Sequence, residues 1–309
     1  MQKLITVEKR RSNTKPQVSD GTFGFLMSLP TFVFMTAVLV YPLGYAFVKS
    51  FHDFNLLMPH RSGFIGLGNY ITALTSREFR FAVKNTVFFT LVSVGIEFVL
   101  GLCIALMLAR IKKFRGLFRT LLVTPIMMAP IVAGFMWRFL LSDQFGLVNH
   151  LLMSLRLINQ PLRWLTSRQL AMWSVIIADV WKTTPFMMLM LLTGLLSLPE
   201  EIMQAADIDG ASGWQKFRYI KLPLLKPVIQ VALLVRLMDA FRIFGMVFVM
   251  TYGGPANHTD TLSFFIYRKG FIEFEVGYAA AAAFVMIGLM ALGGLLLLYL
   301  MNRGARDEA

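Results

Sequence analysis

Six long apolar runs are the feature that most constrains the fold of this chain of 309 residues. A bilayer core about 30 Å thick is crossed by roughly 20 apolar residues in an α-helix. The runs cover Gly24–Val48, Thr86–Ala109, Leu117–Leu141, Gln169–Leu196, Leu224–Thr251 and Ala279–Met301. We therefore predict an all-α membrane protein with six transmembrane helices over residues 24–301, preceded by a tail over 1–23 and followed by one over 302–309.

Lysine and arginine residues predict the orientation of these spans, because cytoplasmic loops carry an excess of them. If the N-terminus lies inside, sixteen such residues are cytoplasmic and ten are external. The clearest single loop is 110–119, with five bases and no acid. Both termini are therefore predicted to be cytoplasmic. The formal net charge of +13 then reflects membrane topology rather than a nucleic-acid partner, since the basic residues form no continuous stripe.

Several kinds of chemistry lack their usual sequence signals. The single cysteine, Cys103, excludes a disulfide framework, and the four histidines show no metal-ligand spacing. No G-x-S-x-G elbow is present, although a Ser–His pair assembled only in space stays open as an enzyme alternative. No G-x-x-x-x-G-K-[ST] phosphate loop occurs either. If ATP drives this protein, another chain must hold the ATPase.

The loop Ser197–Pro223 is predicted to form two short helices that meet at Gly210. Gly210 suits a left-handed helix end. Two N-terminal capping boxes are predicted, Ser197 with Glu200 and Ser212 with Gln215. The pair Leu222-Pro223 is expected to stop the second helix.

This loop has the character of a docking surface. Its first helix carries alanines and an acidic rim, and its second presents Trp214, Phe217 and Ile220 on one face. A rigid amphipathic pair of helices can bind a partner protein. It can also lie on lipid, although the acidic first helix argues against an anionic membrane surface. From the residues alone, both interpretations stay open.

The run Gln204-Ala205-Ala206, followed by Gly210 and then Ile220-x-Leu222-Pro223, resembles the EAA loop of permeases in binding-protein-dependent ATP-binding cassette importers. The chain departs from the family at Gln204, where a glutamate is usual. The resemblance implies that this loop docks in a cleft of a separate ATPase subunit and transmits its motion. The residues implied in this coupling are Glu200, Gln204, Ala205, Ala206, Asp209, Gly210, Leu222 and Pro223.

Residues 66–70, 239–251 and 253–255 resemble the carbohydrate members of that family. Residues 180–186 are similar to permeases for trehalose, maltose and related glycosides. The resemblance implies ATP-driven import of a sugar across a bacterial inner membrane by a chain that is not itself an enzyme. It also implies a second permease subunit of different sequence, two ATPase subunits that hold ATP and Mg, and an outer sugar-binding protein. That protein would be received by the loops Phe51–Tyr70 and Thr251–Ile272, and this chain would bind no cofactor or metal.

Charged residues inside membrane spans are costly and therefore mark candidate functional positions. The candidates for a sugar pathway are Asp179, Trp181, Lys182, Arg236, Asp239 and Arg242. The alternative is that Asp179 with Lys182, and Arg236 with Asp239 and Arg242, neutralise one another at helical spacing and hold helices together. A different class, the ion-coupled secondary transporter, would use Glu97 and Asp179 as carriers, but it leaves the two-helix loop unexplained.

Prolines inside the predicted spans are expected to kink them, because each removes a helical hydrogen bond. They are Pro125, Pro130 and Pro185. The small residues of the last span, Ala279–Ala283 among them, indicate close helix packing rather than a substrate site.

Overall fold

The computed structural model describes residues 20–58, 60, 62–111 and 113–306, and the named elements in these ranges are helices. An isolated bridge between His52 and Phe64 is the one pairing of extended backbone among them. The predicted all-α class is therefore confirmed. The basic residues of the N-terminal tail, Lys112 and residues 307–309 lie outside the described residues.

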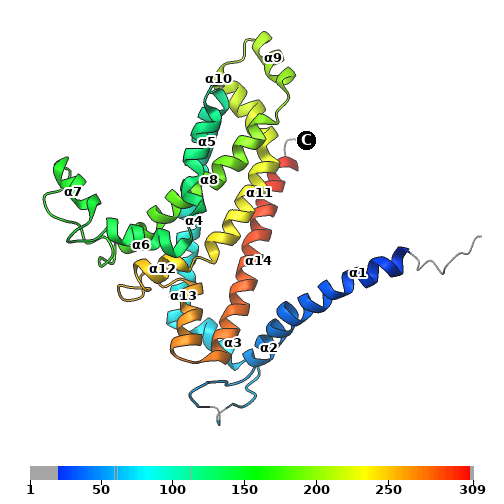
Figure 1. Ribbon diagram of the computed structural model, residues 1–309, viewed down its shortest axis with the longest axis vertical. Helices are drawn as coiled ribbons and strands as arrows, with labels where there is room; N and C mark the ends of the chain where they lie inside the picture. Colours follow the sequence, from blue (N-terminus) through cyan, green and yellow to red (C-terminus); the bar gives the residue numbers. More distant parts are fainter. Residues whose placement is uncertain (1–19, 59, 61, 112, 307–309) are drawn as a thin grey trace, which may run out of the picture. The chain divides into compact units, whose positions relative to one another are not determined.

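The helices follow one another as α1 (Asp20–Met35), α2 (Tyr41–Ser50), α3 (Gly68–Thr75), α4 (Arg77–Arg110), α5 (Arg115–Val123), α6 (Pro130–Leu140), α7 (Leu147–Ser154), α8 (Ala171–Leu196), α9 (Glu200–Ile208), α10 (Gly213–Gln215), α11 (Leu222–Phe241), α12 (Gly245–Met250), α13 (Leu262–Tyr267) and α14 (Val276–Arg306) (Figure 1). Short π-helical segments over Thr36–Val40, Lys216–Lys221 and Arg268–Ile272, and a 3-10 turn over Thr124–Met127, extend or join them.

The chain divides into two compact units between Val48 and Lys49. In the first unit, α1 continues through its π-helical turn into α2 without a break. Residues Gly21–Ser50 make a helix of 30 residues with a mean hydropathy of 2.0, which is long and apolar enough to cross a membrane. This agrees with the first predicted span.

The second unit has its core where α4, α8 and α11 pack together. α8 is central, and 67% of its most apolar stretch is buried. Gly101 of α4 allows the closest approach, because a Cβ atom there would lie 2.9 Å from the Met187 side chain and from the backbone nitrogen of Met188. A small residue at a helix contact lets two backbones pack closely, as in other membrane helix pairs.

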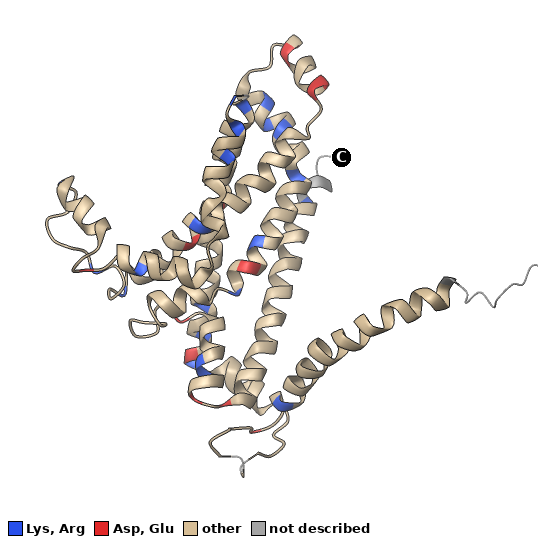
Figure 2. Cartoon of the chain, viewed as in Figure 1, with Lys and Arg blue, Asp and Glu red and all other residues tan. Residues whose placement is uncertain are grey.

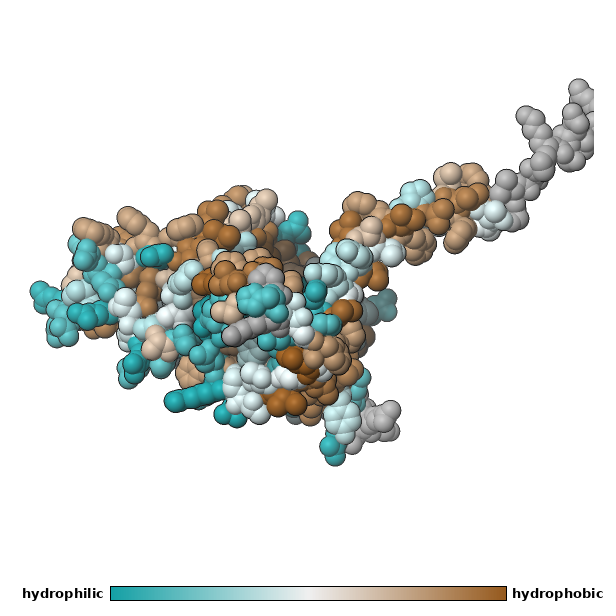
Figure 3. Space-filling view, turned by 90° about the horizontal axis from the view of Figure 1, so that it is seen from below, coloured by the Kyte–Doolittle hydropathy of each residue, from teal (hydrophilic) through white to brown (hydrophobic). Residues whose placement is uncertain are grey.

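Large apolar side chains remain exposed on the flanks of the second unit. Examples are Met107 on α4, Leu121 on α5, and Leu292 and Leu295 on α14, which are 61–66% exposed. Viewed from below, hydrophobic residues spread over the sides of the molecule, with hydrophilic residues gathered among them (Figure 3). Apolar surface of this extent on membrane-length helices fits contact with lipid.

The predicted third span, Leu117–Leu141, is a bent pair rather than one straight helix. Residues Arg115–Met127 and Pro130–Leu140 meet at an angle of 93°. The bend coincides with two of the predicted kink positions, since Pro125 lies in the 3-10 turn and Pro130 begins α6. Pro185, in contrast, lies inside α8 without interrupting it.

The predicted fifth span, Leu224–Thr251, is also not continuous. α11 ends at Phe241, and α12 begins at Gly245. Thr261 stabilises the break by donating from its Oγ1 to the carbonyl oxygen of Ile243, 3.2 Å away. Gly245 then lets α12 pack on α6, because a Cβ atom there would lie 3.2 Å from Pro130. The charges on α11, described below, explain why this segment differs from a simple apolar span.

Among the described residues, four helices are long and apolar enough to span a membrane, and a fifth is added if the bent pair counts as one span. These are Gly21–Ser50, Arg77–Arg110, Ala171–Leu196 and Val276–Arg303, with Arg115–Leu140 as the bent pair. They correspond to the predicted spans one, two, four, six and three. The count of six stays a prediction, because α11 and α12 are not among these helices.

Candidate functional site

The loop between α8 and α11 places two short helices at one end of the second unit (Figure 1). After α9 the backbone turns at Gly210, whose φ of +69° lies in the left-handed region. The N–H of Ala211 then donates to the carbonyl oxygen of Ala206 at 2.9 Å, which satisfies one of the last carbonyls of α9. The predicted left-handed helix end at Gly210 is confirmed.

The capping box predicted at Ser212 forms, whereas the one predicted at Ser197 does not. The Ser212 hydroxyl accepts from the Gln215 N–H at 3.3 Å, and the Gln215 side chain accepts from the Ser212 N–H at 2.7 Å. Ser197 instead ends α8, where its hydroxyl donates to the carbonyl oxygen of Gly194. Its backbone is helical there, while an N-cap residue needs an extended backbone. Pro199 therefore precedes α9, without a side-chain cap.

The second helix of the loop does not stop at Leu222-Pro223, as was predicted. Helical backbone continues from Gly213 through a π-helical segment over Lys216–Lys221 and into α11. Pro223 lies in the first turn of α11, where a missing N–H is tolerated. Leu222 is half-buried and Pro223 is exposed. The loop and the fifth span are thus joined by continuous helix.

The loop exposes apolar side chains that the described part of the chain leaves uncovered. Ile208, Trp214 and Tyr219 are 87%, 69% and 73% exposed. The predicted coupling residues Glu200, Gln204, Ala205, Asp209 and Gly210 are exposed as well, while Ala206 is buried. Acidic residues mark α9, and basic residues gather on the neighbouring ends of α5 and α11 and on the helical segment Lys216–Lys221 between α10 and α11 (Figure 2). An ion pair between Lys216 and Asp207 ties the two short helices together.

A buried ionic cluster lies where α4, α8 and α11 meet, and Arg236 is at its centre. Its Nε donates to Glu97 Oε2 at 2.5 Å, and its Nη2 donates to Glu97 Oε1 at 2.8 Å and to Asp179 Oδ2 at 2.5 Å. Thr183 adds a hydroxyl bond to Glu97 Oε1 at 2.8 Å. Arg236, Glu97 and Asp179 are at most 4% exposed. One guanidinium group therefore joins three helices through charge-assisted hydrogen bonds.

The rim of this cluster is exposed. Asp239 accepts from Arg236 Nη1 at 3.1 Å and lies 3.8 Å from Arg242, and the side chains of Asp239 and Arg242 are 61% and 60% exposed. The predicted pairing within α11 is confirmed. The predicted pairing of Asp179 with Lys182 is wrong, because Asp179 reaches across to Arg236 on another helix. Among the described residues, half-buried Lys182 forms no ion pair.

Glu97 belongs to this cluster, although it was not predicted as a pathway residue. The sequence did carry a signal for it, because Glu97 is a single carboxylate inside the apolar run of α4. An unpaired charge in a membrane span is too costly, so such a residue is expected to have a charged partner on another helix. Trp181 lies near the cluster on α8 and is half-buried, with its ring centroid 5.8 Å from that of Trp137 on α6. Of the predicted pathway residues, the structure brings Asp179, Arg236, Asp239 and Arg242 together.

A second ionic cluster holds the segment 257–275 against α4. Arg268 donates to Asp260 at 2.8 Å and to Glu273 at 2.9 Å, and Lys269 donates to Glu273 at 2.5 Å. Asn85 of α4 donates to the carbonyl oxygen of Asp260 at 3.0 Å. Burial raises the pKa of Asp260 to about 6, although the charge of Arg268 opposes this rise.

The exposed two-helix loop and the helical membrane fold fit a permease component of an importer. Residues 98–305 match the model of the family "binding-protein-dependent transport system inner membrane component", and the chain belongs to this family. Family membership confirms the predicted class, a membrane permease of an ATP-binding cassette importer whose ATPase is a separate subunit. It thereby favours the importer over the ion-coupled alternative.

Proteins similar to this chain include permeases whose names state the sugar that they transport. The chain is 39% identical over 293 residues, 93% of each chain, to the trehalose transport system permease protein SugA of Mycobacterium tuberculosis. It is 37% identical over 278 residues, 89% of this chain and 92% of the other, to the trehalose/maltose transport system permease protein MalF of Thermococcus litoralis.

The fold is similar to that of a solved importer chain. A bacterial ABC transporter involved in the import of the acidic polysaccharide alginate has a chain that matches with a TM-score of 0.78 at 23% identity, over 91% of this chain and 95% of that one. The alginate transporter in complex with an alginate pentasaccharide-bound periplasmic protein matches with a TM-score of 0.75 at 24% identity, over 92% and 94%. At these identities the likeness shows the shared fold.

Proposed function

We propose that this chain carries a neutral sugar, a disaccharide or related glycoside of the trehalose or maltose type, across the bacterial inner membrane. The observation that carries this proposal is the 39% identity to a trehalose permease over 93% of both chains. The exposed coupling loop supports it, because Ile208 and Trp214 offer an apolar docking surface for a further subunit.

We infer the remaining parts of the transporter from the family. Two ATPase subunits hold ATP and Mg and dock on the loop 197–223, and a second permease of different sequence completes the pathway. A sugar-binding protein delivers the sugar to the outer loops Phe51–Tyr70 and Thr251–Ile272. In this arrangement both termini are cytoplasmic, and the chain itself binds no cofactor.

The route of the sugar follows the exposed rim of the Arg236 cluster. Asp239 and Arg242 are about 60% exposed, although they lie at the end of an intramembrane helix. Charged groups in such a position face a wet space rather than lipid. Together with Trp181, Lys182 and Asp179 they offer planar hydrogen-bonding groups and an aromatic face, which suit sugar hydroxyls and ring carbons. ATP and the loaded binding protein each favour one state of the pathway, so that binding shifts the equilibrium between outward and inward access.

The coupling role is tested by ATPase activity of the complex in lipid with its co-purifying chains. Gly210→Pro changes the turn between α9 and α10, and Ala206→Glu places a charge at a buried position of α9. We expect both to abolish stimulation by the loaded binding protein or to release the ATPase. Gly213→Ala is the matched control, because a Cβ atom there meets nothing within 4 Å and the φ is not left-handed. Transport that survives both changes without any ATPase would overturn the proposal.

A further inference from the structure

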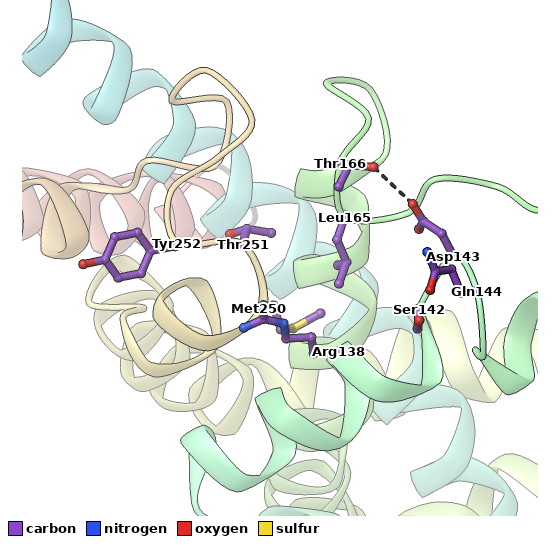
Figure 4. A pocket seen from close by; sticks show the side chains of 9 residues that line it. All are labelled: Arg138, Ser142, Asp143, Gln144, Leu165, Thr166, Met250, Thr251 and Tyr252. Carbon is purple, nitrogen blue, oxygen red and sulfur yellow. Dashed lines mark hydrogen bonds between the residues drawn. The ribbon is translucent and has the colours of Figure 1, made fainter.

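A pocket lies at the end of α6, on the side of α8 away from the coupling loop. It has a volume of about 420 Å³ and is formed by the end of α6, the loop that precedes α8 and the end of α12 (Figure 4). Residues 165 and 166 of its wall precede Ala171, where α8 begins, whereas the coupling loop follows Leu196, where α8 ends. In the topology proposed above, the pocket therefore opens toward the external side. Its volume is within the range of small-molecule sites, roughly 300–1,000 Å³.

The wall of the pocket combines hydrogen-bonding groups with an apolar strip. Arg138 brings a guanidinium group, Gln144 an amide, Asp143 a carboxylate, and Ser142 and Thr166 bring hydroxyls. Leu165 lies between Thr166 and Arg138, Met250 lies beside Arg138, and the Tyr252 side chain points away (Figure 4). One positive and one negative group leave the pocket without net charge. Such a lining suits a neutral ligand with many hydroxyls and an apolar face, which describes a sugar ring.

Two contacts position the charged groups of the pocket. Arg138 donates from Nη1 to the carbonyl oxygen of Val249 at 2.9 Å, so one edge of its guanidinium group is bound to α12. Asp143 Oδ2 accepts from the Thr166 hydroxyl at 3.3 Å, across the loop that precedes α8. Among the described residues, these are the hydrogen bonds of the Arg138 and Asp143 side chains. The remaining guanidinium N–H groups and carboxylate oxygen can therefore bind a ligand.

The pocket is adjacent to the proposed sugar route. Arg138 directly follows Trp137 on α6, and the Trp137 ring contacts that of Trp181 on α8 at 5.8 Å. Trp181 lies two positions from Asp179 in the buried cluster. Trp137 Nε1 is also buried, and it has no hydrogen-bond partner in the described part of the chain. The contact between α6 and α8 thus joins the pocket to the residues proposed to line the pathway.

We propose that this pocket is an outer subsite that binds one ring of a neutral glycoside before the sugar reaches the Arg236 cluster. The proposal rests on the sugar import proposed above. It assigns to Arg138 and Asp143 the recognition of ring hydroxyls, with Leu165 and Met250 against the apolar face of the ring.

Cysteine protection tests the subsite on the complex in lipid nanodiscs, without binding protein. Cys103 is the only native cysteine and is replaced by serine. Gln144→Cys then reports on the pocket, and Phe145→Cys is the control, since the neighbouring Phe145 is 78% exposed and does not line it. A charged, membrane-impermeant thiosulfonate labels each variant with and without millimolar trehalose or maltose. We expect either sugar to slow labelling of Gln144→Cys several-fold and saturably, and to leave Phe145→Cys unchanged.

The contrary outcomes are distinct. Equal protection of both cysteines, or of neither, by the sugars overturns the subsite. Protection of both by sugar-free binding protein, with no effect of sugar, shows a protein-docking face instead and also overturns it. Stimulation of ATPase activity by loaded binding protein is measured on the same Cys103→Ser parent. If stimulation persists while protection fails, the subsite is wrong and the proposed import function stands; if stimulation is absent, the import function itself fails.

Discussion

Replacement of Arg236 by methionine tests whether the buried cluster holds α4, α8 and α11 together. Among the described residues, Arg236 brings the only guanidinium group that contacts Glu97 and Asp179, and its replacement leaves both carboxylates buried at 0% and 4% exposure. Removing one partner of a buried ion pair costs about 3–5 kcal/mol, since the charge left behind is uncompensated. Here two carboxylates lose their partner, so we expect the loss of stability to reach at least the upper part of this range.

Arg242→Met is the matched control, because it makes the same substitution six residues further along the chain. The Arg242 side chain is 60% exposed and lies 3.8 Å from its partner Asp239. Exposed pairs of this kind contribute roughly 0–1 kcal/mol. Thermal unfolding of the purified complex in lipid, followed by tryptophan fluorescence and by size-exclusion chromatography, compares the two variants with the parent.

A triple variant separates charge imbalance from lost packing. Glu97→Gln and Asp179→Asn, combined with Arg236→Met, leave no buried charge in this cluster, and we expect the triple variant to recover much of the stability lost by Arg236→Met alone. The reasoning is refuted if Arg236→Met and Arg242→Met unfold at the same temperature. It is also refuted if the triple variant is less stable than the single one.

Three further predictions concern other positions. Gly210→Ala forces a Cβ atom into a left-handed turn at φ +69°, so it should destabilise the coupling loop by about 1–2 kcal/mol and weaken ATPase docking, whereas Gly213→Ala should not. Gly101→Val should lower the melting temperature and expression of the complex, because Met187 lies 2.9 Å from the added Cβ, while Gly95→Val, with nothing within 4 Å, should be tolerated; equal effects would contradict this packing. Asp260→Asn should change the pH dependence of unfolding. The folded-state pKa of about 6 exceeds the ordinary value of 3.8, so the parent binds an extra proton when folded and loses stability as pH rises from 4 to 6. The melting temperature of the variant relative to the parent should therefore rise across this window, and a constant difference would speak against the titration.

Features that depend on one stretch of chain were predictable from the sequence. The turn at Gly210 and the capping box at Ser212 are local, because a few backbone groups and one side chain decide them. The bend of the third span follows from Pro125 and Pro130, which cannot supply the required N–H groups. The failed capping box at Ser197 shows the limit of this approach. The same residue could begin α9 or end α8, and the bonds to Thr193 and Gly194 favour the end of α8.

Features that depend on contacts between helices were not predictable in the same way. Helical spacing puts Asp179 within reach of Lys182, but it says nothing of Arg236, which is 57 residues away in the sequence. The break after Phe241 depends on a hydroxyl from Thr261, which lies beyond the predicted span. The pathway candidates therefore came from residue type alone, and Glu97 was assigned to the site only once α4 was placed beside α11.

The single guanidinium group shared by three helices also has a mechanical consequence. Because Arg236 binds α4 and α8 at once, sliding of any one of these helices past the others would break several charge-assisted bonds. We therefore expect α4, α8 and α11 to move as one rigid body. We expect hinge motion at the breaks inside the third and fifth predicted spans, before α6 at Ala129 and before α12 at Phe244, because α6 and α12 both border the outer pocket.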